Sequence, residues 1–270
     1  MKITIFGAGA FGYALGETLK ENGHQITYYD PYKFPEVSFE SVLPSAEAYL
    51  LAVPSNFADD IIDRLSTDKP FICATKGFLS IRPLQKFPNL SIISGGAFAD
   101  DILAKKPTIL TATSPLVCEL FENAWLKIEQ TNDALGVLLC GSFKNIYAIG
   151  SGYYGFTPDT LEFEEYITKT CAELKTILSA NQCLPATADL SCGIADLRLT
   201  CASTHSRNYA FGQQLANTPN LTKRLSSGDA TLDITTEGYS AAQALQHSDL
   251  ILPVDTPILT QILDLLNVKE

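Results

Sequence analysis

Apolar and polar residues alternate along the first half of the chain in short blocks that predict strands and helices in turn. Short apolar runs, each bounded by turn residues, predict strands at residues 2–6, 25–29, 48–53, 70–74, 91–93, 108–112 and 125–130. Between the first two runs, residues 11–22 carry apolar side chains at helical spacing and end at Gly23. Strands that alternate with helices indicate βαβ units, and hence an α/β fold with a doubly wound, mostly parallel sheet.

The second half of the chain shows almost no strand pattern and is dominated by helical patterns. Residues 135–149 form an apolar stretch long enough for a buried helix. Thr157-Pro158 is typical of the N-cap and first residue of a helix, and apolar side chains from Phe163 to Leu178 then mark one face. Further helices are expected to begin near Ser206 and at Thr256-Pro257. We therefore predict a mostly parallel α/β domain over residues 1–132 and an all-α domain over residues 133–270.

Length, composition and charge narrow the classes of protein. A chain of 270 residues suggests two domains, at about 150 residues per domain. We find no apolar run that approaches the roughly 20 residues of a membrane span. The N-terminus enters a strand pattern without the features of a signal peptide, so we expect a cytoplasmic protein. A net charge of −11 and a pI near 4.7 argue against nucleic-acid and membrane partners, which are also negatively charged.

The cysteines are seven in number, an odd count, and form no C-x-x-C pair. With only three histidines in the chain, this pattern favours neither a zinc site nor a disulfide framework. We expect no metal, and we expect reduced thiols that act as small core hydrophobes in a reducing compartment.

A glycine motif follows the first predicted strand and opens the first predicted helix: residues 7–12 read Gly-Ala-Gly-Ala-Phe-Gly. In this context G-x-G-x-x-G allows a tight turn and close approach of the backbone to a pyrophosphate, which the helix N-terminus also attracts. A glycine-rich turn without a ligand is the alternative. The motif predicts a Rossmann-type dinucleotide-binding domain, with the cofactor contacted by Gly7, Gly9, Ala10, Phe11 and Gly12.

Asp30 ends the second predicted strand, where an acidic side chain typically accepts a hydrogen bond from the ribose 2′-hydroxyl. This favours NAD, because a carboxylate repels the 2′-phosphate of NADP. Lys33 lies close by and partly offsets the charge, so NADP stays open. Closure of a turn before Pro31 is the competing structural role for Asp30.

Lys144 is the only charged residue in the apolar stretch 135–149. A lysine there is costly to bury unless it is paired, and burial disfavours its charged form, so it is a candidate proton donor and acceptor. A lysine that extends from a helix edge to solvent is the alternative.

Several short stretches resemble the soluble bacterial type of the NAD(P)-dependent glycerol-3-phosphate dehydrogenase family. They occur in the same order as in that family and are found in both halves of the chain. The stretches are G-A-G-A-F-G at 7–12, V-P-S at 53–55, K-G at 76–77, S-G-G-A-F-A at 94–99, G-S-F-K-N-I-Y-A-I at 141–149, D-L-R-L-T-C-A-S-T-H-S-R-N at 196–208, E-G-Y-S-A-A at 237–242 and L-P-V-D-T-P-I at 252–258. The segment at 196–208, together with K-N at 144–145, is far more specific than the glycine motif.

The resemblance implies a cytoplasmic homodimer that reduces dihydroxyacetone phosphate to sn-glycerol 3-phosphate with NAD or NADP, for phospholipid synthesis. By position, Lys144 would exchange a proton with the C2 oxygen, Asp196 would orient Lys144, and Lys76 would lie near both substrate and nicotinamide. Residues 133–270 would be a helical substrate and catalytic domain. Further substrate contacts would come from Gly95, Asn145, Thr200, Ser206, Arg207 and Asn208, and further cofactor contacts from Lys76, Ala99, Arg207 and Glu237.

Elementary chemistry agrees with these roles. Hydride transfer to a ketone leaves an alkoxide, which requires a nearby cationic acid such as Lys144. A phosphate is well held by a helix N-terminus and a guanidinium, and residues 206–208 at the start of a predicted helix offer both. A surface ion pair is the alternative role for Arg207.

By this resemblance the chain would be a shortened member of the family with a changed periphery. Residues 31–47 contain three prolines and leave little room for a helix. The segment 157–178 brings Glu162, Glu164 and Glu165 and lacks an arginine that the family carries, and Gly96 stands where proline is usual. Two alternatives therefore stay open: a related oxidoreductase for another small 2-oxo or hydroxy acid, and a catalytically silent nicotinamide-binding protein.

Overall fold

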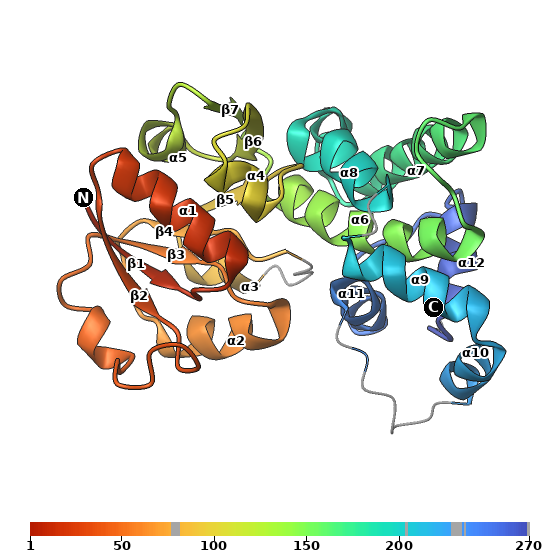
Figure 1. Ribbon diagram of the computed structural model, residues 1–270, viewed down its shortest axis with the longest axis horizontal. Coiled ribbons are helices and arrows are strands. Elements are labelled where there is room, and N and C mark those ends of the chain that lie inside the picture. The colour runs from red at the N-terminus through yellow and green to blue at the C-terminus, as the bar shows by residue number, and fades with distance from the viewer. Residues whose placement is uncertain (77–81, 203–204, 228–233, 235, 269–270) are drawn as a thin grey trace. The chain divides into compact units, whose positions relative to one another are not determined.

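The computed structural model describes residues 1–76, 82–202, 205–227, 234 and 236–268 (Figure 1). Gly77 and residues 203–204 of the motifs above lie outside the described residues. Two compact units are present, which meet in sequence between Ala134 and Leu135.

The first unit is built on a seven-stranded sheet in the order β2-β1-β3-β4-β5-β6-β7. All neighbouring strands are parallel except β5 and β6, which are antiparallel. The strands are β1 (Lys2–Phe6), β2 (Gln25–Tyr29), β3 (Ala48–Leu51), β4 (Phe71–Cys73), β5 (Leu90–Ser94), β6 (Thr108–Ala112) and β7 (Leu126–Gln130). Each predicted strand is therefore present, and the predicted α/β fold with a mostly parallel sheet is confirmed.

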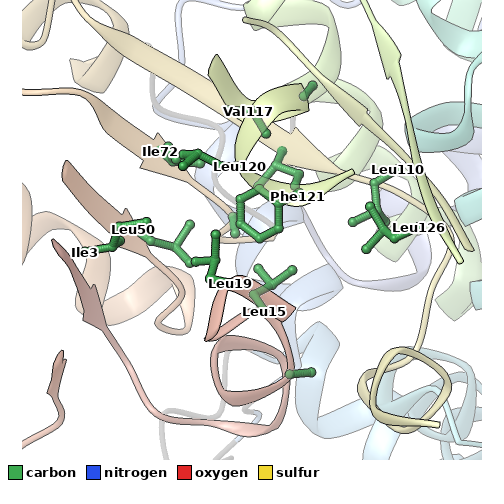
Figure 2. Packing of buried hydrophobic residues seen from close by; sticks show 14 of the residues in the cluster. Ile3, Leu15, Leu19, Leu50, Ile72, Leu110, Val117, Leu120, Phe121 and Leu126 are labelled. Carbon is green, nitrogen blue, oxygen red and sulfur yellow. The ribbon is translucent and has the colours of Figure 1, made fainter. Parts of the chain in front are cut away.

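Helices connect the strands and cover the sheet: α1 (Ala10–Glu21), α2 (Ser55–Arg64), α3 (Arg82–Lys86), α4 (Ala99–Leu103) and α5 (Pro115–Phe121). Between β2 and β3 the chain forms only a short 3-10 turn at Glu40–Val42, as the three prolines predict. Figure 2 shows the core of this unit, in which Leu15 and Leu19 of α1 and Phe121 of α5 belong to one buried cluster with Ile3 and Leu50 of the sheet. Strands buried on both faces need continuous apolar runs, which is why β3 and β4 are apolar throughout.

The second unit is helical throughout its described residues. It contains α6 (Ala134–Tyr154), α7 (Leu161–Ala180), a 3-10 turn at Pro185–Asp189, a π-helical turn at Ser191–Ala195, α8 (Asp196–Ala202), α9 (Arg207–Asn217), α10 (Pro219–Ser226), α11 (Glu237–Leu245) and α12 (Pro257–Leu265). Ser206 caps α9 by accepting a hydrogen bond from the Tyr209 N–H, and Pro257 opens α12 after Thr256, both as predicted. The predicted all-α second half is confirmed.

The predicted start of a helix at Thr157-Pro158 is wrong. Thr160 is the N-cap of α7, and its hydroxyl accepts from the Phe163 N–H at 3.2 Å. Asp159 has a left-handed backbone with φ of 65°, which interrupts a right-handed helix. The helix therefore begins only after this turn.

The helix α6 is 21 residues long and, among the described helices, is the one apolar and long enough to span a membrane. The expectation that no apolar run approaches that length is therefore wrong. The most apolar window of α6 is 89% buried within the protein, and a helix with neighbours on all sides is apolar all round for that reason alone.

The cysteines are all free thiols, and six of the seven are buried, which confirms their predicted place in the core. Burial raises the pKa of the Cys73 thiol to about 11.

Two glycines allow α9 to cross α6 in main-chain contact. A Cβ on Gly152 would lie 2.0 Å from the Tyr209 carbonyl oxygen, and one on Gly212 would lie 2.0 Å from the Ile149 carbonyl oxygen. No side chain can occupy either position without separating the two helices.

We predict that Gly212→Ala destabilises the protein by about 1–3 kcal/mol, the usual cost of overpacking a rigid core. Urea unfolding followed by circular dichroism measures the change. Gln214→Ala, at an exposed position of the same helix, is the matched control and should leave the midpoint unchanged. An unchanged midpoint for Gly212→Ala would show that the helices can move apart freely.

A buried carboxylate joins three helices of the second unit. Glu173 of α7 is 6% exposed and accepts hydrogen bonds from the Tyr147 hydroxyl of α6 at 3.0 Å and from the Ile258 and Leu259 N–H groups at 2.6 and 3.0 Å. Its oxygens thus serve the otherwise unpaired first turn of α12. Burial raises the pKa of Glu173 from its ordinary value, against the effect of these donors.

This raised pKa predicts a pH dependence of stability. The folded chain holds the Glu173 proton more tightly than the unfolded chain, so this stabilising contribution is complete below the ordinary pKa of 4.5 and is lost as pH rises through the folded-state pKa. Glu173→Gln should therefore reduce the fall in stability across the weakly acidic range. Urea midpoints measured at several pH values test this, with the exposed Glu162→Gln on the same helix as control; an unaltered slope in Glu173→Gln would contradict it.

Candidate active site

The glycine motif forms a tight turn from β1 into α1. Gly7 has φ of +99°, and a Cβ there would lie 2.6 Å from the Ala52 carbonyl oxygen. A Cβ on Gly9, the N-cap of α1, would meet nothing within 4 Å. The turn is therefore closed where the backbone packs on β3 and open at the helix N-terminus, where a pyrophosphate would approach.

A cavity of about 450 Å³ lies beside this turn, at the carboxyl ends of β1, β2 and β3. Its lining includes the predicted Gly7, Gly9 and Asp30. Ligands of parallel sheets bind beyond the carboxyl ends of the strands. The size and place of the cavity, with the open Gly9, fit the adenosine part of a dinucleotide.

Sequence reasoning missed part of this lining: Tyr32, Phe57 and Asp60. The rings of Tyr32 and Phe57 pack edge to face with centroids 6.1 Å apart. Their positions in the sequence could have indicated this, because each follows a strand whose carboxyl end faces the cavity. Tyr32 follows β2, and Phe57 lies in the first turn of the helix after β3.

Asp30 both lines the cavity and closes the turn after β2. Its Oδ2 accepts from the Ala8 N–H at 2.9 Å, and its Oδ1 accepts from the Tyr32 and Lys33 N–H groups at 3.1 and 3.2 Å. The Lys33 ammonium donates to the Ala8 carbonyl oxygen. Asp30 therefore closes the turn after β2 and also lies where a cofactor contact is expected.

Three predicted site residues lie close together in the first unit. Lys76 follows β4, Gly95 follows β5, and Phe11 lies in the first turn of α1. The Lys76 Nζ donates to the Gly95 carbonyl oxygen at 3.2 Å and lies 5.0 Å from the centre of the Phe11 ring. Ala99 is the first residue of α4 and packs, partly buried, against the core.

Lys144 and Asp196 form a buried ion pair in the second unit. The Lys144 Nζ lies 2.5 Å from the Asp196 Oδ1, and the two side chains are 3% and 1% exposed. The ammonium also donates to the Thr200 Oγ1 at 3.2 Å, and that hydroxyl donates to the Asp196 carbonyl oxygen at 2.6 Å. Lys144 is therefore not a helix-edge lysine: it is a buried cation held by a carboxylate.

The predicted phosphate segment is tied to α6 and α11. Asn208 is 3% exposed; its Nδ2 donates to the Asn145 Oδ1 at 3.0 Å, and its Oδ1 accepts from the Gly238 N–H at 2.8 Å. Its neighbour Arg207 is 62% exposed and pairs with Glu237. The structure thus brings Asn145, Arg207, Asn208 and Glu237 together, with the Asn208 amide engaged by the protein itself.

Two of the three glutamates near the start of α7 are paired with cations. Glu164 accepts from Arg198 and Glu165 pairs with Lys169 at 2.6 Å. The hydrogen bonds from these cations lower the pKa of both carboxyl groups. The charges of Glu164 and Glu165 are therefore balanced by neighbouring cations.

A glycine turn that leads from the first strand of a parallel sheet into a helix is typical of dinucleotide-binding domains. A family model described as the NAD-dependent glycerol-3-phosphate dehydrogenase C-terminus matches residues 133–270. A glycerol-3-phosphate dehydrogenase (NAD(P)+) of Staphylococcus saprophyticus is 30% identical, over 96% of this chain and 91% of the relative. The enzyme of that name from Staphylococcus aureus is 28% identical over 95% of this chain and 91% of its own length. The chain belongs to the NAD-dependent glycerol-3-phosphate dehydrogenase family, and the resemblance found in the sequence is confirmed.

Solved structures support the same fold. The glycerol-3-phosphate dehydrogenase of Coxiella burnetii matches with a TM-score of 0.76 at 22% identity, over 99% of both chains. That of Plasmodium falciparum matches with a TM-score of 0.80 at 15% identity, over 98% of this chain and 91% of its own.

We predict that Asp196→Ala costs about 3–5 kcal/mol of stability, because it leaves a buried ammonium without its counter-charge. The double variant Lys144→Met/Asp196→Leu should recover most of that loss, since neither charge then remains. Denaturant unfolding of both variants measures the difference. Glu165→Gln, which breaks the exposed pair with Lys169, is the control and should have no measurable effect. A double variant as unstable as Asp196→Ala would contradict the ion-pair explanation.

Proposed function

We propose that this protein is an NAD(P)-dependent glycerol-3-phosphate dehydrogenase that transfers hydride reversibly between NAD(P)H and dihydroxyacetone phosphate, giving sn-glycerol 3-phosphate for phospholipid synthesis. The observation that carries the proposal is the buried Lys144–Asp196 pair in a chain of this family. A solvent-excluded ammonium beside a carboxylate has no need to exist for packing alone, because apolar residues of equal volume stabilise a core at least as well.

The residues of the first unit fit a dinucleotide. Gly7, Gly9 and Gly12, with the N-terminal amides of Ala10 and Phe11, would hold the pyrophosphate, and Asp30 the adenosine ribose. When bound, the nicotinamide supplies or accepts the hydride at C2 of the substrate. In this proposal residues 1–132 are the dinucleotide-binding domain, with Lys76 and Ala99 as further cofactor contacts.

Lys144 is the proposed acid and base. Its ammonium would donate a proton to the C2 oxygen as the alkoxide forms, and its amine would take the proton back in the oxidative direction. Asp196 is the proposed orienting residue, because its Oδ1 lies 2.5 Å from the ammonium and fixes its direction. Thr200 accepts another of the ammonium protons, which leaves fewer orientations open to it.

The substrate phosphate would be held at the start of α9. The Arg207 guanidinium is exposed and so accessible to a ligand, and it would exchange part of its contact with Glu237 for the phosphate oxygens. Ser206, Asn145 and Asn208 shape this region, and Lys76 and Gly95 are the proposed substrate contacts of the first unit. Residues 133–270 are thus the proposed substrate and catalytic domain, in a cytoplasmic homodimer.

We predict that Lys144→Ala lowers kcat for dihydroxyacetone phosphate reduction by roughly 10²–10⁴-fold, the usual contribution of a positioned general acid. The assay is oxidation of NADH and of NADPH, followed by absorbance, with and without dihydroxyacetone phosphate. Lys169→Ala removes an exposed lysine in the same unit and should keep full activity. Nucleotide binding by Lys144→Ala shows that the variant is folded.

Two results would redirect the proposal. Full turnover by Lys144→Ala would remove Lys144 from the chemistry. Turnover of unphosphorylated 2-oxo acids, unaffected by Arg207→Ala, would indicate the related oxidoreductase instead.

A further inference from the structure

The helix α8, which carries Asp196 at its start, is held to α6 at a second point. The Ser151 hydroxyl of α6 donates a hydrogen bond to the Cys201 carbonyl oxygen of α8 at 2.9 Å, and both residues are fully buried. Cys201 lies in the last turn of α8, where carbonyl groups have no acceptor role left within the helix. Ser151 therefore supplies a donor to a carbonyl group that is shielded from water.

The Ser151 hydroxyl is directed at α8 because its usual local acceptor is occupied. A serine within a helix commonly donates to the carbonyl oxygen four residues earlier, as Ser142 of α6 does to Leu138 at 3.0 Å. For Ser151 that acceptor is the Tyr147 carbonyl oxygen, which receives the Tyr166 hydroxyl of α7 at 2.6 Å in addition to a main-chain N–H of its own helix. Two donors use both lone pairs of a carbonyl oxygen, so the Ser151 hydroxyl bonds across to the neighbouring helix.

Lys144 and Ser151 contact opposite ends of α8 from one face of α6. The two residues are close to two full helical turns apart, so their side chains lie on the same side of the helix. Lys144 meets the first turn of α8 at Asp196, and Ser151 meets its last turn at Cys201. Two fixed points set the direction of a short helix, whereas a single point would let it pivot. A pivot of α8 would change the distance between the ammonium and the carboxylate.

We propose that Ser151 is a positioning residue for proton transfer: it holds the last turn of α8 so that the Asp196 carboxylate keeps its contact with the Lys144 ammonium. The inference rests on the proposed function, in which Lys144 is the acid and base, and adds a buried residue that acts through another helix. Removal of the Ser151 hydroxyl should therefore change the properties of the ion pair as well as the stability of the fold.

A double-mutant cycle in stability tests the proposal without any need for turnover. Urea midpoints are measured by circular dichroism for Ser151→Ala in the unaltered protein and in the Lys144→Met/Asp196→Leu background. If the hydrogen bond serves the ion pair, the changes are coupled, and the midpoint shift caused by Ser151→Ala should be smaller by about twofold or more in the background without the pair. Equal shifts in both backgrounds would show a hydrogen bond that is only structural, and would overturn the proposal.

The pH profile of dihydroxyacetone phosphate reduction gives a second test. Reduction requires the Lys144 ammonium, so activity falls on the alkaline side, where that proton is lost. The Cys201 thiol faces the same pair and stays neutral, because burial raises its pKa well above the ordinary value. Glu173, a further carboxylate buried against α6, loses its proton on the acidic side of the profile. The alkaline limb therefore reports on the contact between Lys144 and Asp196.

Ser151→Ala should move this alkaline limb of kcat to lower pH by about 0.5–1 pH unit, the effect of lengthening a charge–charge contact of 2.5 Å by a few tenths of an ångström. It should also lower kcat roughly tenfold and change KM less than about twofold, because a misplaced acid affects the chemical step. An unaltered alkaline limb would contradict the proposal.

Two further variants separate positioning from stability. Ser142→Ala removes an equally buried serine hydroxyl from α6 that bonds within its own helix, and as the matched control it should preserve kcat and the pH profile. Ser151→Thr keeps the hydroxyl and should preserve the profile of the unaltered protein, even though the added methyl group lowers stability. A profile for Ser151→Thr like that of Ser151→Ala would count against the hydrogen bond as the cause.

The outcomes distinguish this proposal from the proposed reaction. Coupling in the stability cycle, with no turnover of dihydroxyacetone phosphate, would support Ser151 as the residue that positions the pair and contradict the reaction. Turnover that is lost in Lys144→Ala, with the alkaline limb unchanged in Ser151→Ala, would support the reaction and contradict the positioning role.

Discussion

The second unit is organised around the burial of one positive charge. An ammonium in the middle of an apolar helix is tolerated only when a carboxylate and a further acceptor meet it, because the desolvation of an unpaired ion is far more costly than any packing gain. Lys144 therefore requires Asp196 at its side, and α8 must begin where that carboxylate reaches the ammonium. The π-helical turn at Ser191–Ala195 directly precedes Asp196. An irregular backbone therefore leads into the residue whose position is restricted by the buried ammonium.

Much of the fold could be predicted because burial dictates pattern. The central strands of a sheet covered on both faces are short apolar runs. All seven strands could be recognised in the sequence. Lys144 was recognisable as the only charge in an apolar stretch. Its partner was not, because Asp196 lies far away in sequence and only the resemblance indicated it. The same holds for the Asn208–Asn145 hydrogen bond and for Glu173, whose roles depend on which helices meet. The start of α7 was misplaced because Asp159 has a left-handed backbone. Neither the spacing of apolar residues nor the preference for capping residues indicates that conformation.

The cations that bear on anion binding have individual partners in both units. The chain carries a net charge of −11. The cations that could attract an anion are few, and the structure assigns them individually: Lys33 to a loop, Lys144 to a buried carboxylate, and Arg207 to Glu237. Among these three, Arg207 is the exposed cation that is paired with a carboxylate side chain, which a ligand anion can replace. Selectivity among anions therefore depends on the few cations that remain exchangeable, and the overall charge acts against non-specific anion binding.

The glycine crossing of α6 and α9 bears on how the family can diverge. The helix that carries the buried lysine and the helix that begins with the guanidinium segment touch through their main chains, at Gly152 and Gly212. Their separation is therefore set by the thickness of two backbones, which is the same in every sequence. If Lys144 is the proton donor and Arg207 the anion anchor, as proposed, the distance between their helices depends on two glycines and not on the residues that fill the core.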